Sequence, residues 1–294
     1  MEWDPTQFFR EDKDQPPPPF ALVILNQPIN ETALSVLRKH ARITVCADGG
    51  ANRFNEWAKS RHEEDINLPD TIIGDLDSIH PEIRTHYAAR GVRIVQDDDQ
   101  YSTDFTKSLR YLRDHEREII TGSSNPASDE KSLEILILGG LGGRVDQAFS
   151  QIHHLYMMNQ ARSPESGPGS GQGNLYLISE ESITFILQPG PNKIHVPRAH
   201  IPLTIRSSTQ SPPDKQKEDQ EEYLLEENVG IIPLSGPARI STKGLQWDVE
   251  NWATEIGGQI STSNHIRAEM VEVTAEAPVL FTLELARRLK RVSR

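Results

Sequence analysis

Short apolar runs alternate with amphipathic stretches between residues 20 and 160. The run at 133–138, for example, precedes Val145, Phe149, Ile152 and Tyr156, whose spacing is that of one helix face. Strands that alternate with helices favour right-handed βαβ units and a mostly parallel sheet. The pattern predicts strands at 20–25, 43–46, 71–73, 92–95 and 133–138.

The pattern changes near residue 175. Apolar runs become short and follow one another closely between turn residues, which is typical of an antiparallel β-sandwich or partial barrel. The predicted fold class is therefore α/β, with a mostly parallel α/β nucleotide-binding domain followed by an antiparallel β-sandwich domain. The predicted boundaries are a flexible proline-ended arm (1–19), the α/β domain (20–160), a Gly/Ser/Pro linker (161–174) and the β-sandwich domain (175–294) with a polar, mobile insertion (207–228).

Composition narrows the classes of partner. The net charge of −12 disfavours binding to nucleic acid, and no apolar run is long enough to span a membrane. The first residues lack the features of a signal peptide, and one cysteine, Cys46, excludes an internal disulfide bond. We therefore expect a cytoplasmic protein with no nucleic-acid or membrane partner.

Carboxylates follow several of the predicted strands. Asp48 follows 43–46, Asp75 and Asp77 follow 71–73, and Asp104 lies beyond 92–95. Ligands bind at the carboxyl ends of parallel strands, and hard oxygen ligands suit Mg²⁺. Asp75 and Asp77 project to the same side if the backbone there is extended. A polar turn is the alternative for this pair, and helix capping is the alternative for Asp104.

A glycine-rich loop at 139–143 precedes Arg144 and a predicted helix. Its free N–H groups and the helix N-terminus favour a phosphate, which Arg144 can also contact. The loop fits neither the Walker pattern nor the dinucleotide fingerprint. A tight strand-to-helix turn is the alternative, although it needs fewer glycines.

Trp247 and the neighbouring pair Ser263 and Asn264 mark a second candidate site. The indole is either a core residue or a stacking platform for an aromatic, cationic ligand, and the residues alone leave both open. Ser263 and Asn264 have the hydrogen-bonding groups to assist such a ligand.

Together these motifs resemble the thiamine pyrophosphokinase family, specifically its eukaryotic single-function members. The matching stretches include CADGGANRF, PDTIIGDLDSI and ISTSNHI, and they occur in the order of the family. The full set of matching stretches lies at 46–54, 69–79, 99–109, 138–147, 187–196, 230–237, 242–249 and 260–266.

The resemblance implies transfer of a pyrophosphoryl group from ATP to thiamine, with Mg²⁺ as cofactor, giving thiamine diphosphate and AMP. It also implies a homodimer with active sites at the subunit interface. The implied metal ligands are Asp75, Asp77 and Asp104. The other implied site residues are Asp48 and Asp146 among the catalytic carboxylates, Gln100, Thr103, Lys107, Gly140, Gly142, Gly143 and Arg144 around ATP, and Trp247, Ser263 and Asn264 around thiamine.

Two other functions fit parts of the pattern. A different Mg²⁺-dependent phosphoryl or nucleotidyl transferase would use the same carboxylates but release other products. A thiamine or nucleotide sensor would need no catalytic carboxylates, so the presence of Asp48, Asp75, Asp77 and Asp104 favours an enzyme.

Overall fold

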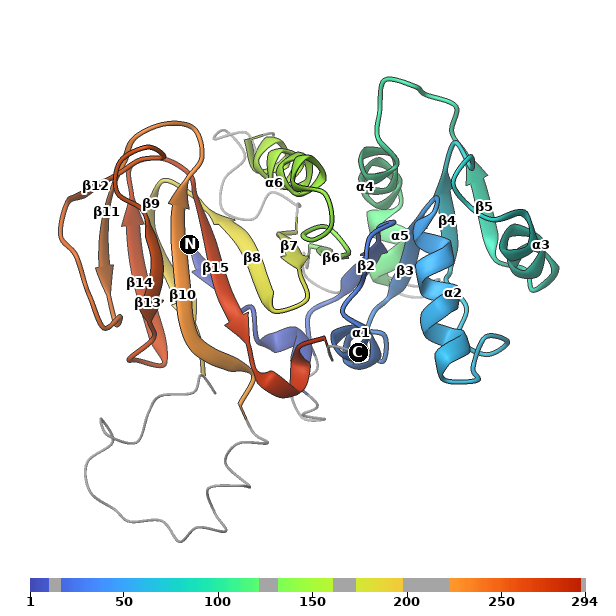
Figure 1. The fold of residues 1–294 in the computed structure, drawn as a ribbon, viewed down its shortest axis with the longest axis horizontal. Coiled ribbons are helices and arrows are strands. Elements are labelled where there is room, and N and C mark those ends of the chain that lie inside the picture. The colour runs from blue at the N-terminus through green and yellow to red at the C-terminus, as the bar shows by residue number, and fades with distance from the viewer. Residues whose placement is uncertain (11–16, 122–131, 161–172, 198–222, 292–294) are drawn as a thin grey trace, which may run out of the picture. The chain divides into compact units, whose positions relative to one another are not determined.

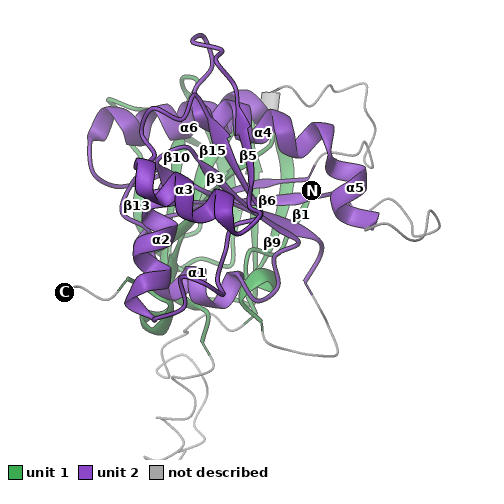
Figure 2. Ribbon diagram, turned by 90° about the vertical axis from the view of Figure 1, so that its right-hand side faces the viewer, with its two compact units in different colours: residues 1–11, 181–294 green, residues 12–180 purple. Residues whose placement is uncertain are grey.

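A computed structural model describes residues 1–10, 17–121, 132–160, 173–197 and 223–291. The chain divides into two compact units, residues 12–180 and residues 1–11 with 181–294 (Figure 2). Within the described residues, no helix is long and apolar enough to cross a membrane.

The unit of residues 12–180 holds a sheet in which all strand pairs are parallel, in the order β7-β6-β2-β3-β4-β5 (Figure 1). This confirms the predicted α/β sheet. The strands are β2 (Phe20–Ile24), β3 (Ile43–Ala47), β4 (Thr71–Gly74), β5 (Arg93–Gln96), β6 (Glu134–Leu138) and β7 (Leu175–Ile178). The helices are α1 (Glu31–Leu37), α2 (Gly50–Ser60), α3 (Pro81–Ala89), α4 (Asp104–Asp114), α5 (Glu116–Thr121) and α6 (Val145–Gln160).

Local sequence explains where several of these helices begin. The side chain of Asn30 accepts a hydrogen bond from Ala33 N at the start of α1, and Pro81 opens α3 with its fixed φ. Gly50 opens α2 against β2, where an added Cβ would lie 2.0 Å from Ile24 O. Each of these helices follows a strand, and the segment that joins the strand to its helix lies at the carboxyl edge of the sheet.

The unit of residues 1–11 and 181–294 contains two sheets, which confirms the predicted antiparallel β domain. One has the order β13-β10-β15-β8 and is antiparallel throughout. The other has the order β1-β9-β14-β11-β12. Trp3 in the second sheet stacks on Phe185 in the first, with ring centroids 4.8 Å apart. The strands are β1 (Glu2–Trp3), β8 (Ser182–Leu187), β9 (Gly190–His195), β10 (Leu225–Pro233), β11 (Ala238–Lys243), β12 (Trp252–Thr254), β13 (Ser261–His265), β14 (Met270–Ala275) and β15 (Val279–Leu285).

The predicted flexible arm at 1–19 is wrong for residues 1–10. Strand β1 pairs with β9 in parallel, and Trp3 is buried with its indole N–H donating to Asn192 Oδ1 at 3.1 Å. Phe8 and Phe9 are also buried in the short 3₁₀ helix Gln7–Phe9. Burial of these aromatic rings outweighs the entropic cost of ordering the segment. Residues 11–16 lie outside the described residues.

Two other predicted boundaries move. Strand β7 belongs to the parallel sheet through its pairing with β6, so the change of unit falls at residue 180 rather than before 175. The end of the predicted insertion is also wrong, because Leu224 and Leu225 are buried and β10 begins at Leu225. Most of the linker (161–172) and of the insertion (207–222) lies outside the described residues.

Candidate active site

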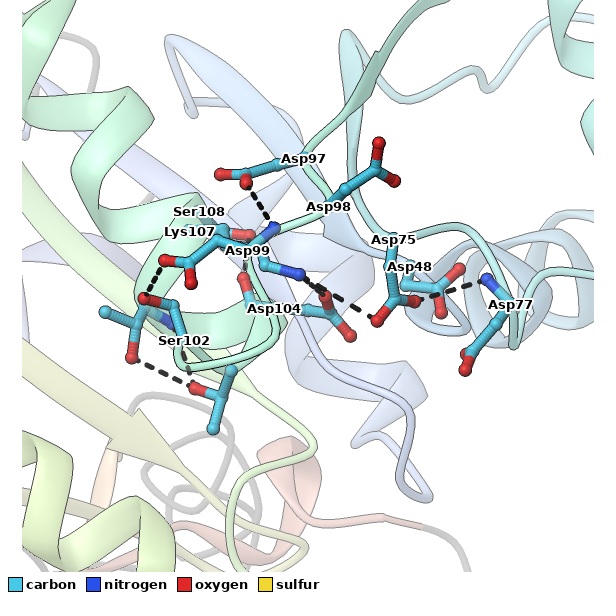
Figure 3. A network of polar contacts seen from close by, with 12 residues as sticks. Asp48, Asp75, Asp77, Asp97, Asp98, Asp99, Ser102, Asp104, Lys107 and Ser108 are labelled. Carbon is cyan, nitrogen blue, oxygen red and sulfur yellow. Dashed lines mark hydrogen bonds and ion pairs between the residues drawn. The ribbon is translucent and has the colours of Figure 1, made fainter.

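Three carboxylates meet at the carboxyl edge of the parallel sheet. Asp48 follows β3, Asp75 follows β4, and Asp104 begins α4. One oxygen from each lies within 4.8 Å of the other two (Figure 3). We call these residues the acidic triad. Carboxylates that lie so close repel one another unless a cation is present, so the triad has the composition of a site for a hard metal ion.

Asp48 is the most deeply placed member. Its Oδ2 accepts a 2.9 Å hydrogen bond from Ser78 N, and its Oδ1 accepts one of 3.1 Å from Ile79 N. Its backbone is left-handed, with φ of 40°, a conformation that Asp tolerates better than most residues. Burial raises the pKa of this carboxyl above its ordinary value of 3.8, although the two backbone donors oppose the shift.

Asp77 is not part of the triad. The prediction that it projects beside Asp75 assumed an extended backbone, but Leu76 between them has φ of 67°. Asp77 is exposed, and its Oδ1 accepts a hydrogen bond from Ser78 Oγ at 2.9 Å. The structure thus groups Asp48, rather than Asp77, with Asp75 and Asp104, and the role of Asp77 as a metal ligand stays a prediction.

Lys107 lies against the triad from α4. Only 1% of its side chain is exposed, and its Nζ lies 3.2 Å from Asp104 Oδ1 and 3.9 Å from Asp75 Oδ2. Burial raises the pKa of Asp104 above 3.8, and the bond from Lys107 opposes this shift. Lys107 is therefore buried as a partner of two carboxylates rather than exposed to solvent, and the triad keeps an excess of negative charge.

Gly74 makes the close approach of these carboxylates possible. A Cβ at this position would lie 2.6 Å from Asp48 Cβ and 2.9 Å from Asp104 Oδ1. No real side chain fits these distances without moving one of the two carboxylates. Gly74, the last residue of β4, thus contributes to the site because its lack of a side chain leaves room for the two carboxylates.

The loop between β5 and α4 carries the predicted ATP residues Gln100 and Thr103. Asp99 accepts a hydrogen bond from Ser102 Oγ at 2.6 Å (Figure 3). It also accepts one from Tyr101 N at 2.9 Å, and the two bonds hold the loop. The Ser102 bond is the main cause that lowers the pKa of Asp99. Thr103 caps α4 by accepting from Thr106 N, while Gln100 is exposed.

The glycine-rich loop follows β6 at the same edge of the sheet. Gly139, Gly142 and Gly143 have φ of 79°, 152° and 64°, a backbone that requires glycine. Arg144 donates from Nε and Nη2 to the carboxylate of Asp146, at 3.1 and 2.6 Å. The hydrogen bond raises the pKa of Arg144 and lowers that of Asp146. Both side chains are exposed, so the guanidinium group can exchange this partner for a phosphate.

The β unit holds a separate cavity of about 320 Å³, within the usual size range of small-molecule sites. We call it the aromatic cavity. Trp247 is 55% exposed in it, which excludes a core role for this residue. Trp252, which the sequence reasoning missed, also lines the cavity, and its Nε1 donates to Gln259 Oε1 at 3.1 Å. The lining residues are Ile231, Ile240, Thr242, Trp247, Val249, Trp252, Ile260, Ser261, Thr262, Ser263 and Asn264.

Asn264 fixes the backbone of Trp247. Its Oδ1 accepts from Trp247 N at 3.1 Å, and its Nδ2 donates to Trp247 O at 2.8 Å. The same Oδ1 accepts from His265 N at 2.9 Å, so one amide hydrogen of Asn264 has no bond in this set. Ser263 lies beside it and is exposed.

The two units thus carry two kinds of site: carboxylates, a lysine and a glycine-rich loop on a parallel α/β sheet, and an aromatic cavity in a β unit. This combination is typical of enzymes that bind a phosphorylated ligand with a metal ion and that also bind an aromatic ligand. Two family descriptions match the chain. "Thiamin pyrophosphokinase, catalytic domain" covers residues 34–164, and "Thiamin pyrophosphokinase, vitamin B1 binding domain" covers residues 215–280.

Individual relatives agree. The chain is 31% identical to thiamine pyrophosphokinase 1 of Oryza sativa subsp. japonica over 275 residues, which covers 90% of this chain and 87% of the relative. It is 28% identical to the thiamine pyrophosphokinase of Saccharomyces cerevisiae, with 83% and 78% covered. The solved thiamin pyrophosphokinase of Candida albicans superposes with a TM-score of 0.73 at 28% identity, covering 97% of this chain and 92% of that one.

The chain therefore belongs to the thiamine pyrophosphokinase family and is an enzyme with thiamine diphosphokinase activity. This confirms the fold class and the reaction that the sequence motifs implied.

Proposed function

We propose that the acidic triad holds the Mg²⁺ of Mg–ATP in this chain. The observation that carries the proposal is the meeting of Asp48, Asp75 and Asp104 within 4.8 Å. Burial raises the pKa of Asp48 and of Asp104, so ionising these two carboxylates costs free energy that a bound cation would offset. Asp77 stays a predicted ligand, since its exposed carboxylate lies next to the triad in sequence.

The phosphates of ATP bind around this edge of the sheet. A Mg²⁺ ion held by the acidic triad would offset negative charge on the phosphate oxygens. Lys107 adds a fixed positive charge beside the triad, and the glycine-rich loop with Gly140, Gly142 and Gly143 offers backbone N–H groups at the start of α6. Arg144 leaves Asp146 to contact a phosphate, and Gln100 and Thr103 lie on the opposite flank, before α4.

Thiamine binds in the aromatic cavity. Its rings are aromatic and its thiazolium ring is cationic, and the face of Trp247 attracts both kinds of group. Ser263 and the remaining amide hydrogen of Asn264 offer hydrogen bonds. The residues of the aromatic cavity contribute contact area and orient thiamine. The carboxylates of the acidic triad, Lys107 and Arg144, which are proposed to bind Mg–ATP, lie in the unit of residues 12–180.

The reaction joins the hydroxyethyl oxygen of thiamine to the β-phosphorus of ATP. The bond between the β-phosphorus and the oxygen of AMP breaks, AMP leaves with that electron pair, and the hydroxyl proton is released. Positioning of the two substrates and neutralisation of the phosphate charge account for most of the acceleration.

We propose further that the enzyme is a homodimer in which the acidic triad of one chain works with the aromatic cavity of its partner. The support is the family resemblance, together with the placement of the two sets of residues in separate units. The cytoplasmic location expected from the sequence also stays a prediction.

Mixing two inactive variants tests this arrangement. Asp104→Asn damages the triad and Trp247→Ala damages the cavity, so each homodimer is nearly inactive at low thiamine. After co-refolding in equal amounts, a shared site leaves one intact site in each heterodimer, and roughly a quarter of wild-type sites return. No recovery, with heterodimers confirmed by mass spectrometry, would show that each site lies within one chain.

A further inference from the structure

The indole ring of Trp247 has one aromatic neighbour among the described residues. The ring of His265 meets it in a T-shaped arrangement, with centroids 5.3 Å apart and planes at 83°. His265 does not line the aromatic cavity, so it contacts Trp247 from outside that space. Edge-to-face pairs of this kind are favourable, and they restrict the rotation of both rings.

A charged group holds His265 in turn. Its Nδ1 lies 3.1 Å from Oε1 of Glu227, and Arg267 Nη1 donates to Oε2 of the same carboxylate at 2.6 Å. Arg267 Nη2 also donates to the side chain of Gln246, the residue directly before Trp247. These contacts therefore link Glu227 on β10 and His265 at the end of β13 to Gln246, which directly precedes Trp247.

Glu227 remains charged in this setting. Burial acts to raise its pKa, but hydrogen bonds from Arg267 and His265 outweigh this effect, and the pKa lies below its ordinary value of 4.5. The ionised carboxylate accepts the hydrogen bond from Arg267 and keeps its other oxygen 3.1 Å from Nδ1 of His265. This close contact with a charged oxygen favours one orientation of the imidazole ring beside Trp247.

We propose that His265 is a positioning residue for thiamine, acting through the ring of Trp247. Asn264 fixes the backbone of Trp247, and the T-shaped contact with His265 restricts the rotation of its ring beside the open cavity. The inference rests on the proposed stacking of thiamine on Trp247. It assigns to His265 an effect on thiamine binding, while the triad and its ATP are unaffected.

Steady-state kinetics of single and double variants test this role. His265→Ala raises the KM for thiamine on the order of three- to tenfold, with kcat and the KM for ATP near wild type. Trp247→Ala raises the KM for thiamine further. The double variant matches Trp247→Ala alone, because a residue that acts through the indole has no effect once the indole is gone.

Two conservative variants separate the ring from its polar edge. His265→Phe keeps an aromatic edge and retains a KM for thiamine close to wild type, whereas His265→Gln keeps a polar group near Glu227 and behaves like His265→Ala. The near-normal KM for ATP in each variant reports that the chain is folded.

Several results would overturn the inference. The first is an unchanged KM for thiamine in His265→Ala, and the second is additive effects on this KM in the double variant. The third is a KM for thiamine that stays near wild type in His265→Gln but not in His265→Phe. If Trp247→Ala itself leaves the KM for thiamine unchanged, the stacking role of Trp247 fails, and that failure is distinct from a failure of His265 alone.

Discussion

The ammonium group of Lys107 donates a 3.2 Å hydrogen bond to Oδ1 of Asp104, and only 1% of the lysine side chain is exposed. Among Lys and Arg side chains of the described residues, Lys107 alone has a nitrogen within 4.0 Å of a triad carboxylate. It thus acts as a fixed counterion that lets the carboxylates approach one another. The remaining negative charge is what a metal ion would neutralise.

Replacing Lys107 with Met removes this counterion and keeps the volume. The free energy of unfolding at pH 7 should fall by about 1–3 kcal/mol, because three close carboxylates lose their cation. The folded-state pKa of Asp104, already raised, should rise further. A group with a raised folded pKa stabilises the fold below its unfolded pKa, and that stability is lost as the pH rises through the folded pKa. The deficit should therefore shrink as the pH falls toward 3.8. Denaturant unfolding at several pH values measures this, and a deficit independent of pH would contradict it.

Removing a charge from the triad should remove the response to Mg²⁺. In the wild type, Mg²⁺ should raise the Tm. As the pH is lowered, this rise in Tm should disappear at a pH above the ordinary carboxyl pKa of 3.8, because the pKa values of Asp48 and Asp104 are raised. Asp75→Asn and Asp104→Asn should lose both the Tm rise and turnover. Asp65→Asn, an exposed carboxylate paired with Arg90, is the control and should keep both. A normal Mg²⁺ response in both triad variants would contradict the assignment.

Gly74→Ala tests the close approach at the end of β4. The new methyl group would meet Asp48 and Asp104 within 2.9 Å, so the triad must open. Turnover should fall by more than roughly tenfold if the reacting groups shift by about 1 Å. In Gly258→Ala the atoms nearest to the new methyl group belong to the exposed side chain of Glu255, and activity should be unchanged. Equal activity in the two variants would argue against a catalytic role for this approach.

Trp252 should contribute to the cavity as well as Trp247. Trp252→Ala removes an aromatic wall, and the KM for thiamine should rise by roughly two- to tenfold. Trp252→Phe keeps a ring and loses only the hydrogen bond to Gln259, so its effect should be smaller. Steady-state kinetics with thiamine as the varied substrate measure the KM of both variants, and an unchanged KM in Trp252→Ala would place thiamine away from this wall.

The parallel sheet was predictable because its buried strands are continuous apolar runs, as in β2, where every residue is buried. The packed N-terminus was not, since the segment 4–7 (DPTQ) separates Trp3 from the adjacent pair Phe8 and Phe9 and leaves no apolar run. The partners of Trp3 are also distant in sequence, at Phe185 and Asn192. Long-range partners of this kind leave no periodic signal in a short segment.

The candidate site was predictable in its residue types but not in its geometry. The motifs placed Asp48, Asp75 and Asp104 at strand ends, where the sheet brings them together. The position of Asp77 depends on the left-handed backbone of Leu76, which no side-chain pattern reveals. His265 was missed for a related reason, because its role depends on a ring contact that forms only in the folded β unit.

Analysis of the products tests the central claim most directly. The purified chain is incubated with ATP, Mg²⁺ and thiamine, and the phosphorus-containing products are identified by ³¹P NMR. We predict equal amounts of thiamine diphosphate and AMP, formed by the wild type and not by Asp104→Asn. Formation of ADP with thiamine monophosphate, or release of pyrophosphate, would show a different transfer and contradict the account.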